Sequence, residues 1–150
     1  MELFTKVNVY LANLTILYKK VQNLHWNIKG KEFFGLHQKY DDIYNELQDK
    51  VDEVAERILA KGHTPVSNYR EVLEIATIKE RESSDVACEE AVKIFLKDLE
   101  AIIKDSYELA DLCSDEGDCV SEDLFIGYIK DFEKHRWMFQ SVLSGIKCKN

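Results

Sequence analysis

One amphipathic stretch of the chain, residues 33–58, reads FFGLHQKYDDIYNELQDKVDEVAERI. Its apolar residues recur in steps of three and four, which is the spacing of one face of an α-helix. They are Phe33, Leu36, Tyr40, Tyr44, Leu47, Val51, Val54 and Ile58. Gly62 and Pro65 follow, and such residues are typical of a helix end. The stretch therefore predicts a helix of about seven turns with one buried face.

Three other stretches of similar length repeat this spacing. They run over residues 3–28 as far as Gly30, from a Ser83-Ser84-Asp85 cap to about Asp115, and from about Ser121 to Gly145. Their apolar positions are Leu3, Val7, Tyr10, Leu14, Leu17, Val21, Leu24 and Ile28, then Val92, Phe95, Leu99, Ile102, Ile103 and Leu109, then Leu124, Tyr128, Phe132, Trp137, Phe139 and Leu143. A shorter amphipathic segment, from Ser67 to Ala76, has Ser67 or Asn68 as its expected N-cap. With no strand alternation, the pattern predicts an all-α four-helix bundle with a short extra helix between helices two and three.

Length and composition limit the class of protein. The chain has 150 residues, 45% of them hydrophobic, which is typical of a single domain over residues 1–150 with its own core. No apolar run approaches the ~18–20 residues of a membrane span, and the N-terminus lacks the features of a secretion signal. We therefore expect a soluble, cytoplasmic protein with no membrane partner. The formal net charge of −8 favours cations over nucleic acid or anionic lipid.

The cysteines and the common catalytic motifs argue against several kinds of site. The four cysteines, Cys88, Cys113, Cys119 and Cys148, lack metal-finger spacing and are expected to be free thiols, although the sequence does not decide their redox state. No Glu-x-x-His sequence occurs, so a di-iron site inside a single four-helix bundle is not encoded. A Gly-rich phosphate loop and a Ser–His–Asp arrangement are also absent from the sequence.

Four polar residues lie beside the apolar face of the stretch at 33–58. With His37 at zero and about 100° per residue, Asp41 lies at about 40°. Asp52 and Glu56 lie at about 60° and about 100°, on the same flank. Each of the two pairs is spaced by four residues, so each pair can direct two ligands at one point. Imidazole and carboxylate ligands of this kind suit Fe(II), Mn(II) or Zn(II).

The two pairs cannot hold one ion within a single chain. Their centres are about 15 residues apart, which is about 22 Å along a helix axis. Two copies of the helix that run antiparallel across a two-fold axis would bring the first pair of one chain to the second pair of the other. His25, close to the turn at Gly30, would fold back beside His37 as a further nitrogen ligand. The spacing thus predicts two equivalent sites in a homodimer.

Simpler interpretations of the same residues are open at this point. Acidic pairs on a helix usually form a solvated surface, and a single histidine such as His25 more often packs or caps a helix. His63 and His135 lack an acidic partner at ligand spacing and are expected to be structural or surface residues. Five residues on converging faces nevertheless favour a metal site.

A set of motifs resembles the Dps family of mini-ferritins over nearly the whole chain. The motifs are His25-Trp26-Asn27-Ile28-Lys29-Gly30, Phe33, Leu36-His37, Asp41, Asp52-Glu53-Val54-Ala55-Glu56-Arg57-Ile58, Gly62, Pro65 and, late in the chain, Asp131-Phe132-Glu133-Lys134-His135-Arg136-Trp137-Met138. The spacing His-x11-His-x3-Asp-x10-Asp-x3-Glu is highly specific.

The resemblance implies a ferritin-like four-helix subunit, assembled as a hollow dodecamer with a ferroxidase centre between two-fold-related subunits. By position, His25, His37 and Asp41 would bind iron from one subunit. Asp52 and Glu56 would bind it from the partner subunit. The implied chemistry is oxidation of Fe(II), with hydrogen peroxide as the preferred oxidant. Ferric mineral would be stored in the cavity, which protects against oxidative stress.

Further positions match the family outside the ligand set. Trp26 resembles a family tryptophan near the centre, where it would either quench radicals or simply pack. Glu116, Asp118 and Asp123 resemble the acidic pore through which iron would enter. Cys119 stands where an acid is expected, so the details of this pore differ from the family pattern.

Direct binding of DNA is the alternative function in this family and is not expected here. Members that bind DNA usually carry a Lys/Arg-rich tail, whereas the first helix is expected to start almost at Met1 and only Lys147 and Lys149 follow Gly145. A net charge of −8 leaves few phosphate contacts. A third hypothesis is a structural assembly with a degenerate site, and the five intact ligand positions argue against it.

Overall fold

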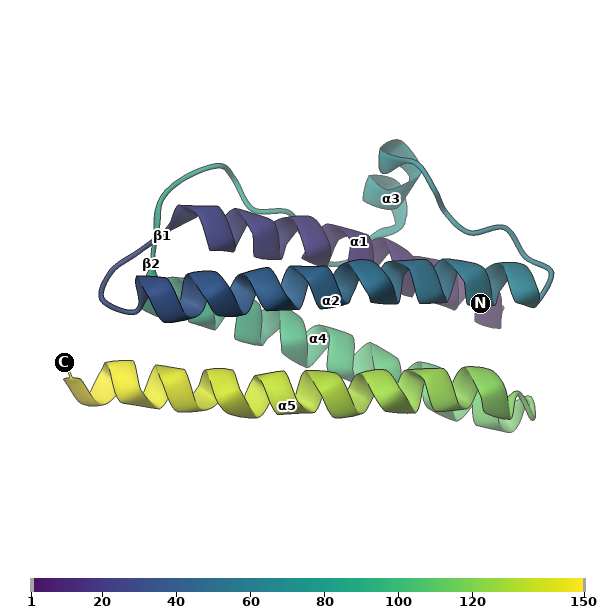
Figure 1. Ribbon diagram of the computed structural model, residues 1–150. Coiled ribbons are helices and arrows are strands. Elements are labelled where there is room, and N and C mark those ends of the chain that lie inside the picture. Colours follow the sequence, from purple (N-terminus) through teal and green to yellow (C-terminus); the bar gives the residue numbers. More distant parts are fainter. Residues whose placement is uncertain (1, 150) are drawn as a thin grey trace. The chain divides into compact units, whose positions relative to one another are not determined.

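The protein is almost entirely helical in a computed structural model, which describes residues 2–149 and the side chains of residues 2–146 (Figure 1). The elements in chain order are α1 (Leu3–Asn27), β1 (Ile28–Lys29), α2 (Phe33–Ala60), α3 (Tyr69–Ile75), β2 (Val86–Ala87), α4 (Cys88–Asp115) and α5 (Cys119–Lys149). This order confirms the all-α class and the short helix after the second long one. Among the described residues, no helix combines the length and apolarity that a bilayer crossing requires.

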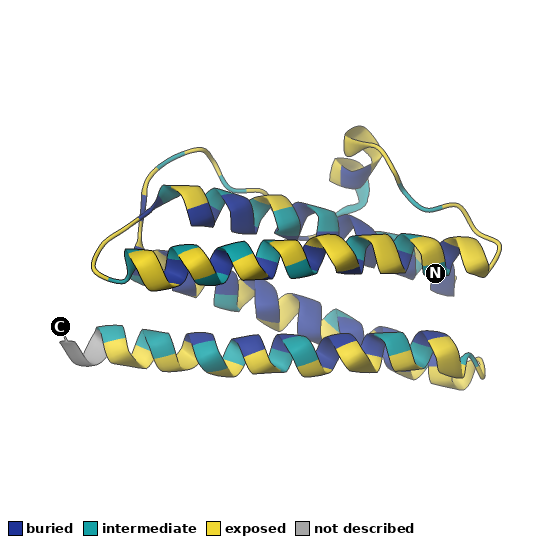
Figure 2. Cartoon of the chain, viewed as in Figure 1, coloured by how far each residue is buried: buried dark blue, intermediate teal, exposed yellow. Residues whose placement is uncertain are grey.

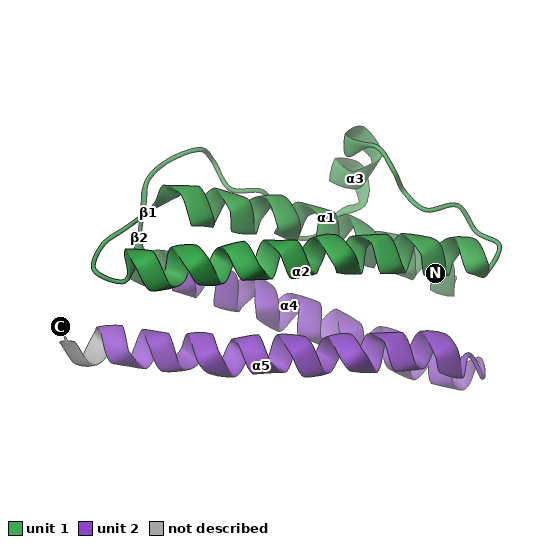
Figure 3. Cartoon of the chain, viewed as in Figure 1, with its two compact units in different colours: residues 1–91 green, residues 92–150 purple. Residues whose placement is uncertain are grey.

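The chain divides into two compact units, residues 1–91 and residues 92–150 (Figure 3). Helix α4 begins in the first unit and continues in the second. The expected single domain over residues 1–150 stays a prediction. In each unit the long helices carry stripes of buried residues, whereas α3 and the loops are mostly exposed (Figure 2).

In residues 1–91, α1 and α2 lie side by side and run antiparallel, and α3 contacts α1 (Figure 1). Every apolar position predicted for α1 is buried. On α2, Phe33, Tyr44 and Val51 are only half-buried. At about 100° per residue, these three lie on the edge of the apolar face that borders the polar flank. The half-buried edge therefore keeps the candidate ligands of α2 close to solvent.

The segment before α4 differs from the prediction, which began this helix at Ser83-Ser84-Asp85. The helix begins instead at Cys88, because β2 pairs in parallel with β1. The Arg81 guanidinium donates hydrogen bonds to the carbonyl oxygen of Ser84 (2.8 Å) and to the side-chain oxygen of Asn23 (2.7 Å). The polar residues that look like a helix cap are thus part of a loop tied to α1. A two-residue ladder is too short to produce an alternating sequence pattern.

Three asparagine side chains order the connection between α2 and α4. Asn68 accepts a hydrogen bond from the backbone N–H of Glu71 (3.0 Å) and caps α3, as one of the two predicted caps. Asn13, on the buried side of α1, accepts from the backbone N–H of Thr77 (2.7 Å) and donates to its hydroxyl (2.9 Å). Asn8 accepts from the N–H of Val66 (2.7 Å). Together with the bond between Asn23 and Arg81, side-chain hydrogen bonds therefore attach this connection to α1 at three places.

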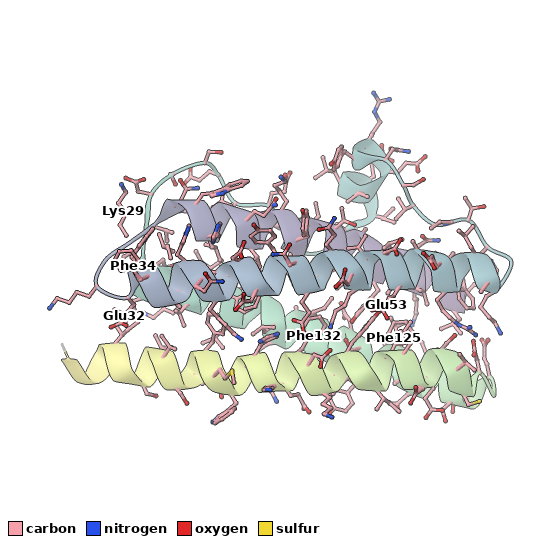
Figure 4. The ribbon with its side chains drawn as sticks, in the orientation of Figure 1. Lys29, Glu32, Phe34, Glu53, Phe125 and Phe132 are labelled. Carbon is pink, nitrogen blue, oxygen red and sulfur yellow. The ribbon has the colours of Figure 1, made fainter. Side chains whose placement is uncertain are left out.

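In residues 92–150, α4 and α5 run antiparallel (Figure 1). The rings of Phe95 and Phe139 meet edge to face with centroids 4.8 Å apart, and Arg136 bonds Glu100 at 3.3 Å. The buried Phe125 and Phe132, marked in Figure 4, lie along α5. Every apolar position predicted for α4 is buried.

Three predictions for α5 are wrong in detail. The helix begins at Cys119 rather than Ser121, because the Asp118 carboxylate accepts hydrogen bonds from the backbone N–H (3.1 Å) and hydroxyl (2.6 Å) of Ser121 and forms the cap. It continues past Gly145 to Lys149, since an internal glycine costs only about 1 kcal/mol relative to alanine. Trp137 is 62% exposed. It lies five residues after the buried Phe132, or about 140° around the helix from it.

Candidate metal centre

His25 and His37 bind each other's backbone. His25 belongs to the last turn of α1 and His37 to the second turn of α2. The Nδ1 atom of His25 lies 2.6 Å from the carbonyl oxygen of His37, and Nδ1 of His37 lies 2.7 Å from the carbonyl oxygen of His25. A carbonyl oxygen only accepts hydrogen bonds, so each Nδ1 carries the proton. In the neutral rings, each Nε2 therefore keeps a lone pair that can bind a cation.

The imidazole rings are held by stacking as well as by hydrogen bonds. Their centroids are 3.8 Å apart with an angle of 8° between the planes. On its other side, the His37 ring stacks on Phe33 at 4.9 Å. His25 is buried and His37 is half-buried. The two rings are therefore oriented before any ligand arrives.

The short turn between α1 and α2 makes this pairing possible. Gly30 has a φ of +136°, which side chains rarely permit, and its carbonyl accepts from the N–H of Phe33 (3.2 Å). A Cβ atom at Gly30 would lie 3.3 Å from Sγ of Cys88. Backbone freedom and close approach thus both favour glycine at this turn.

Asp41 follows His37 by one helical turn and is half-buried. The Tyr44 hydroxyl donates a hydrogen bond to the Asp41 carboxylate, and this bond raises the pKa of Tyr44 above its ordinary value. The Tyr44 ring meets the His25 ring edge to face, with centroids 5.4 Å apart. Tyr44 therefore connects Asp41 to the histidine pair.

Asp52 and Glu56 form a second cluster on the exposed side of α2. The negative charge of Asp52 raises the pKa of Glu56, and a hydrogen bond between the two carboxyl groups adds to the shift. Asp52 also lines a groove of about 800 Å³. The walls of this groove come from α1, α2 and α3, with Leu11, Val51, Ala55 and Val72 among the apolar lining residues. A cation bound between two such carboxylates would remove their mutual repulsion, so this pair favours cation binding.

The structure thus brings the five predicted residues together only in part. His25 contacts His37, and Asp52 interacts with Glu56. Among the residues that the structure describes, no group of three or more potential ligands lies together in a single copy. Helix α2 is continuous from Phe33 to Ala60, so the two clusters are about 22 Å apart along its axis.

The sequence interpretation missed Tyr44, which it assigned to the core alone. Its spacing held the signal, because a residue three positions after Asp41 lies beside it on the helix surface. Tyr18 of α1 was also missed, although its ring contacts Tyr44 with centroids 6.0 Å apart. Position in the sequence gives no sign of that contact.

The remaining candidates have simpler roles. His63 stacks on Phe4 at 4.6 Å, and His135 is buried, so the first is a surface residue and the second a structural one. Among the described residues, Cys88, Cys113 and Cys119 form no disulfide, and the side chains of Cys148, Lys147 and Lys149 lie outside the described part. Asp118 caps α5, while Glu116 and Asp123 are exposed.

The comparisons with known proteins agree with one another. A family model described as a ferritin-like domain matches residues 5–148. General stress protein 20U of Bacillus subtilis is 36% identical over 142 residues, which cover 95% of this chain and 97% of that protein. DNA protection during starvation protein 2 of Bacillus anthracis is 36% identical over 138 residues, or 92% of this chain and 94% of that protein.

A solved structure has the same fold. The crystal structure of Dps from Staphylococcus aureus matches with a TM-score of 0.90 at 40% identity, over 94% of each chain. The fold class is accordingly the ferritin-like four-helix bundle with a short extra helix. With a family model and relatives that span nearly its full length, the chain belongs to the Dps family of ferritin-like proteins.

Proposed function

We propose that the protein is a ferroxidase and iron-storage mini-ferritin whose iron sites are shared between two chains. Each site would take His25, His37 and Asp41 from one subunit and Asp52 and Glu56 from its partner. One observation carries this proposal. His25 and His37 each donate Nδ1–H to the backbone carbonyl of the other, which leaves both Nε2 atoms available for a cation. An isolated packing role for two histidines would not require that orientation.

The donor set fits iron as a substrate. Carboxylates stabilise the hard Fe(III) ion, and imidazole keeps a useful affinity for Fe(II). The raised pKa of Glu56 reflects repulsion from Asp52, and a bound cation would relieve that repulsion. The net charge of −8 per chain would also raise the local concentration of Fe(II) around the assembly.

The proposed reaction uses hydrogen peroxide as the preferred oxidant. Two Fe(II) ions give one electron each, and one peroxide takes up both electrons and two protons to become two water molecules. Two ions held in one site permit this two-electron reduction, so hydroxyl radical is not released. The ferric product would be stored as mineral in the cavity of a cytoplasmic dodecamer. In that assembly, residues 1–150 would act as a single ferritin-like domain.

The first experiment measures iron oxidation directly. Metal-free protein is titrated with Fe(II) without oxygen, peroxide is added, and ferric absorbance and residual peroxide are followed. Wild type is expected to oxidise iron rapidly with stoichiometric peroxide loss, and Asp52→Ala/Glu56→Ala is expected to be slow. Asp49→Ala/Glu53→Ala is the matched control, because this exposed pair has the same spacing on the same helix. Equal slow oxidation in all three proteins would reject the proposal.

A complementation experiment tests whether the site is shared. His25→Ala/His37→Ala and Asp52→Ala/Glu56→Ala are each expected to be inactive alone. When the two variants are co-expressed, a mixed dimer contains one complete site and one empty one. Random pairing then restores about one quarter of the wild-type sites in a two-fold dimer. A site within one chain would give no restoration.

A further inference from the structure

Two large apolar side chains of α2 are exposed at opposite ends of the helix. Phe34, in the first turn (Figure 4), is 85% exposed, and Leu59, in the last turn, is 58% exposed. Of the described residues of α2, no other large apolar side chain is exposed. With His37 at zero and about 100° per residue, Phe34 lies at about 60° and Leu59 at about 40°. Both therefore lie on the face that carries the four candidate ligands of α2.

The two exposed residues are placed symmetrically with respect to the candidate ligands. The point midway between them along α2 falls between residues 46 and 47. It is also midway between His37 and Glu56, and midway between Asp41 and Asp52. A two-fold axis at this point, with two antiparallel copies of α2, brings each of these residues level with its counterpart in the other copy. The register that completes the metal sites therefore also sets the two exposed apolar residues level with each other across the axis.

We propose that Phe34 of one subunit packs on Leu59 of its partner at both ends of the α2 pair, and that these two contacts hold the register in which the metal sites form. Both are positioning residues, because neither has an atom that binds iron. This inference rests on the proposed function, in which each site is shared between two chains. It adds the contact that aligns the two halves of each site.

The charges on this face explain why the pair needs such a contact. In a metal-free dimer, the carboxylate of Asp41 and that of Asp52 in the partner would be level with each other and would repel. Within one chain, Asp52 already raises the pKa of Glu56 by repulsion. The ligand positions therefore oppose pairing until a cation is bound. Apolar side chains that leave water on pairing supply an attraction that does not depend on the metal.

The centre of the face suits the same arrangement. Asn45 and Gln48, both exposed, lie on either side of the midpoint of α2 and are level with each other across the axis. Their amide groups can donate and accept hydrogen bonds where the two helices lie closest. Two helices that cross at about 20° are further apart at their ends than at their centre. The larger Phe34 and Leu59 side chains would fill that wider space.

Phe34 is also connected to the histidine pair. Its ring meets the Phe33 ring edge to face, with centroids 5.5 Å apart, and Phe33 stacks on His37. A partner residue that packs on Phe34 therefore limits the movement of the rings that orient a candidate ligand. Loss of the contact is expected to weaken metal binding although no ligand changes.

A cross-linking experiment tests the contact. Assembled Phe34→Cys/Leu59→Cys protein is oxidised and run on a non-reducing gel, where a covalent dimer is expected. Phe34→Cys and Leu59→Cys alone should stay monomeric on the gel, because two copies of one position are about 37 Å apart along the pair. Asp42→Cys/Leu59→Cys is the matched control, since Asp42 is also exposed on α2 but lies about 12 Å out of register with Leu59. A missing dimer, or as much dimer in the single variants or the control, would overturn the proposal.

The effect on the metal site is measured as affinity for Co(II). Phe34→Ala/Leu59→Ala is expected to bind Co(II) about tenfold more weakly than wild type, although every candidate ligand is retained. The disulfide form of Phe34→Cys/Leu59→Cys should bind like wild type, because the covalent bond restores the register. Ile126→Ala removes another exposed apolar side chain, in residues 92–150, and should leave the affinity unchanged. Unchanged affinity in the double alanine variant, or weak binding by the disulfide form, would reject the positioning role.

The two experiments also separate this inference from the proposed function. If iron oxidation depends on Asp52 and Glu56 but the cross-link does not form, only the contact between Phe34 and Leu59 is rejected. If the cross-link forms but wild type oxidises iron no faster than Asp52→Ala/Glu56→Ala, the contact stands and the ferroxidase function is rejected.

Discussion

His25 and His37 each donate a ring N–H to the backbone carbonyl of the other, at 2.6 and 2.7 Å. The carbonyl of His25 belongs to the last turn of α1, where carbonyl groups lack a partner within the helix. His37 therefore caps α1 while it presents its own Nε2, and the His37 carbonyl in α2 likewise holds the His25 ring. Each histidine is thus both a candidate ligand and the support of the other ligand.

This reciprocity predicts that substitutions of the two histidines are not additive. His25→Ala and His37→Ala are each expected to weaken Co(II) binding by about 10–100-fold, because each removes one ligand nitrogen and the stacking contact that helps to orient the other ring. The double variant should be only slightly worse than either single one, since residues that act as one unit couple strongly. Isothermal titration of the metal-free protein with Co(II) measures the affinities. His63→Ala is the control, and additive losses would contradict the interpretation.

The periodicity of apolar residues predicts most of the fold, because each long helix carries a stripe of buried residues on one face. It does not give the start of α4, since that depends on pairing between β1 and β2, which are far apart in sequence. It also places Trp137 in the core, although the face defined by Tyr128, Phe132 and Phe139 turns Trp137 to the surface.

The sequence likewise predicts some features of the candidate site and not others. Spacing on one helix selects Asp52 and Glu56 as a pair, and the turn at Gly30 predicts that His25 returns to His37. The carbonyl–imidazole bonds and the contact of Tyr44 with Tyr18 depend on how α1 and α2 are aligned. Residue types and their spacing do not predict how α1 and α2 are aligned.

Asn13 is expected to be important for stability. It is fully buried, accepts hydrogen bonds from the N–H groups of Thr77 and Ile78, and donates to the Thr77 hydroxyl. Asn13→Ala leaves these groups without partners, so the free energy of unfolding should fall by about 2–3 kcal/mol. Urea denaturation monitored by circular dichroism measures it. Asn8→Ala, at a half-buried site with similar bonds, should cost less, and an equal loss would argue against the role of burial.

Gly30→Ala tests the turn that joins the histidines. The φ of +136° is strained for alanine, and the new Cβ would lie 3.3 Å from Sγ of Cys88. We expect a loss of about 1–3 kcal/mol in the free energy of unfolding, together with weaker Co(II) binding. Gly117→Ala is the matched control, because its φ is also positive (+74°) but open space surrounds the Cβ. Gly117→Ala should lower the free energy of unfolding by less than Gly30→Ala and should leave Co(II) binding unchanged. A larger loss in Gly117→Ala than in Gly30→Ala would contradict this interpretation.

The charge of the chain predicts little affinity for DNA. With a net charge of −8 per chain, repulsion from phosphate should prevent a mobility shift of duplex DNA at about 0.15 M salt. As a positive control, a fused Lys-rich segment should produce a shift that disappears as salt is raised. Tight, salt-resistant binding of DNA by the wild type would contradict the low affinity expected from the net charge.

The repulsion between Asp52 and Glu56 makes a prediction about pH. The pKa of Glu56 is raised in the folded chain, so over the range between the ordinary and the raised pKa the native state binds more protons than the unfolded state. This pair therefore makes the native state less stable as pH rises through that range.

Asp52→Asn should return the pKa of Glu56 towards its ordinary value and remove this pH dependence, whereas Asp49→Asn should not. Carbon-13 NMR titration of the glutamate carboxyl groups in metal-free protein measures the shift. A bound redox-inert divalent cation should also lower the apparent pKa, because it stabilises both carboxylates. If Glu56 titrates identically in wild type and Asp52→Asn, the two carboxyl groups do not interact, and the second half of the proposed iron site loses its physical basis.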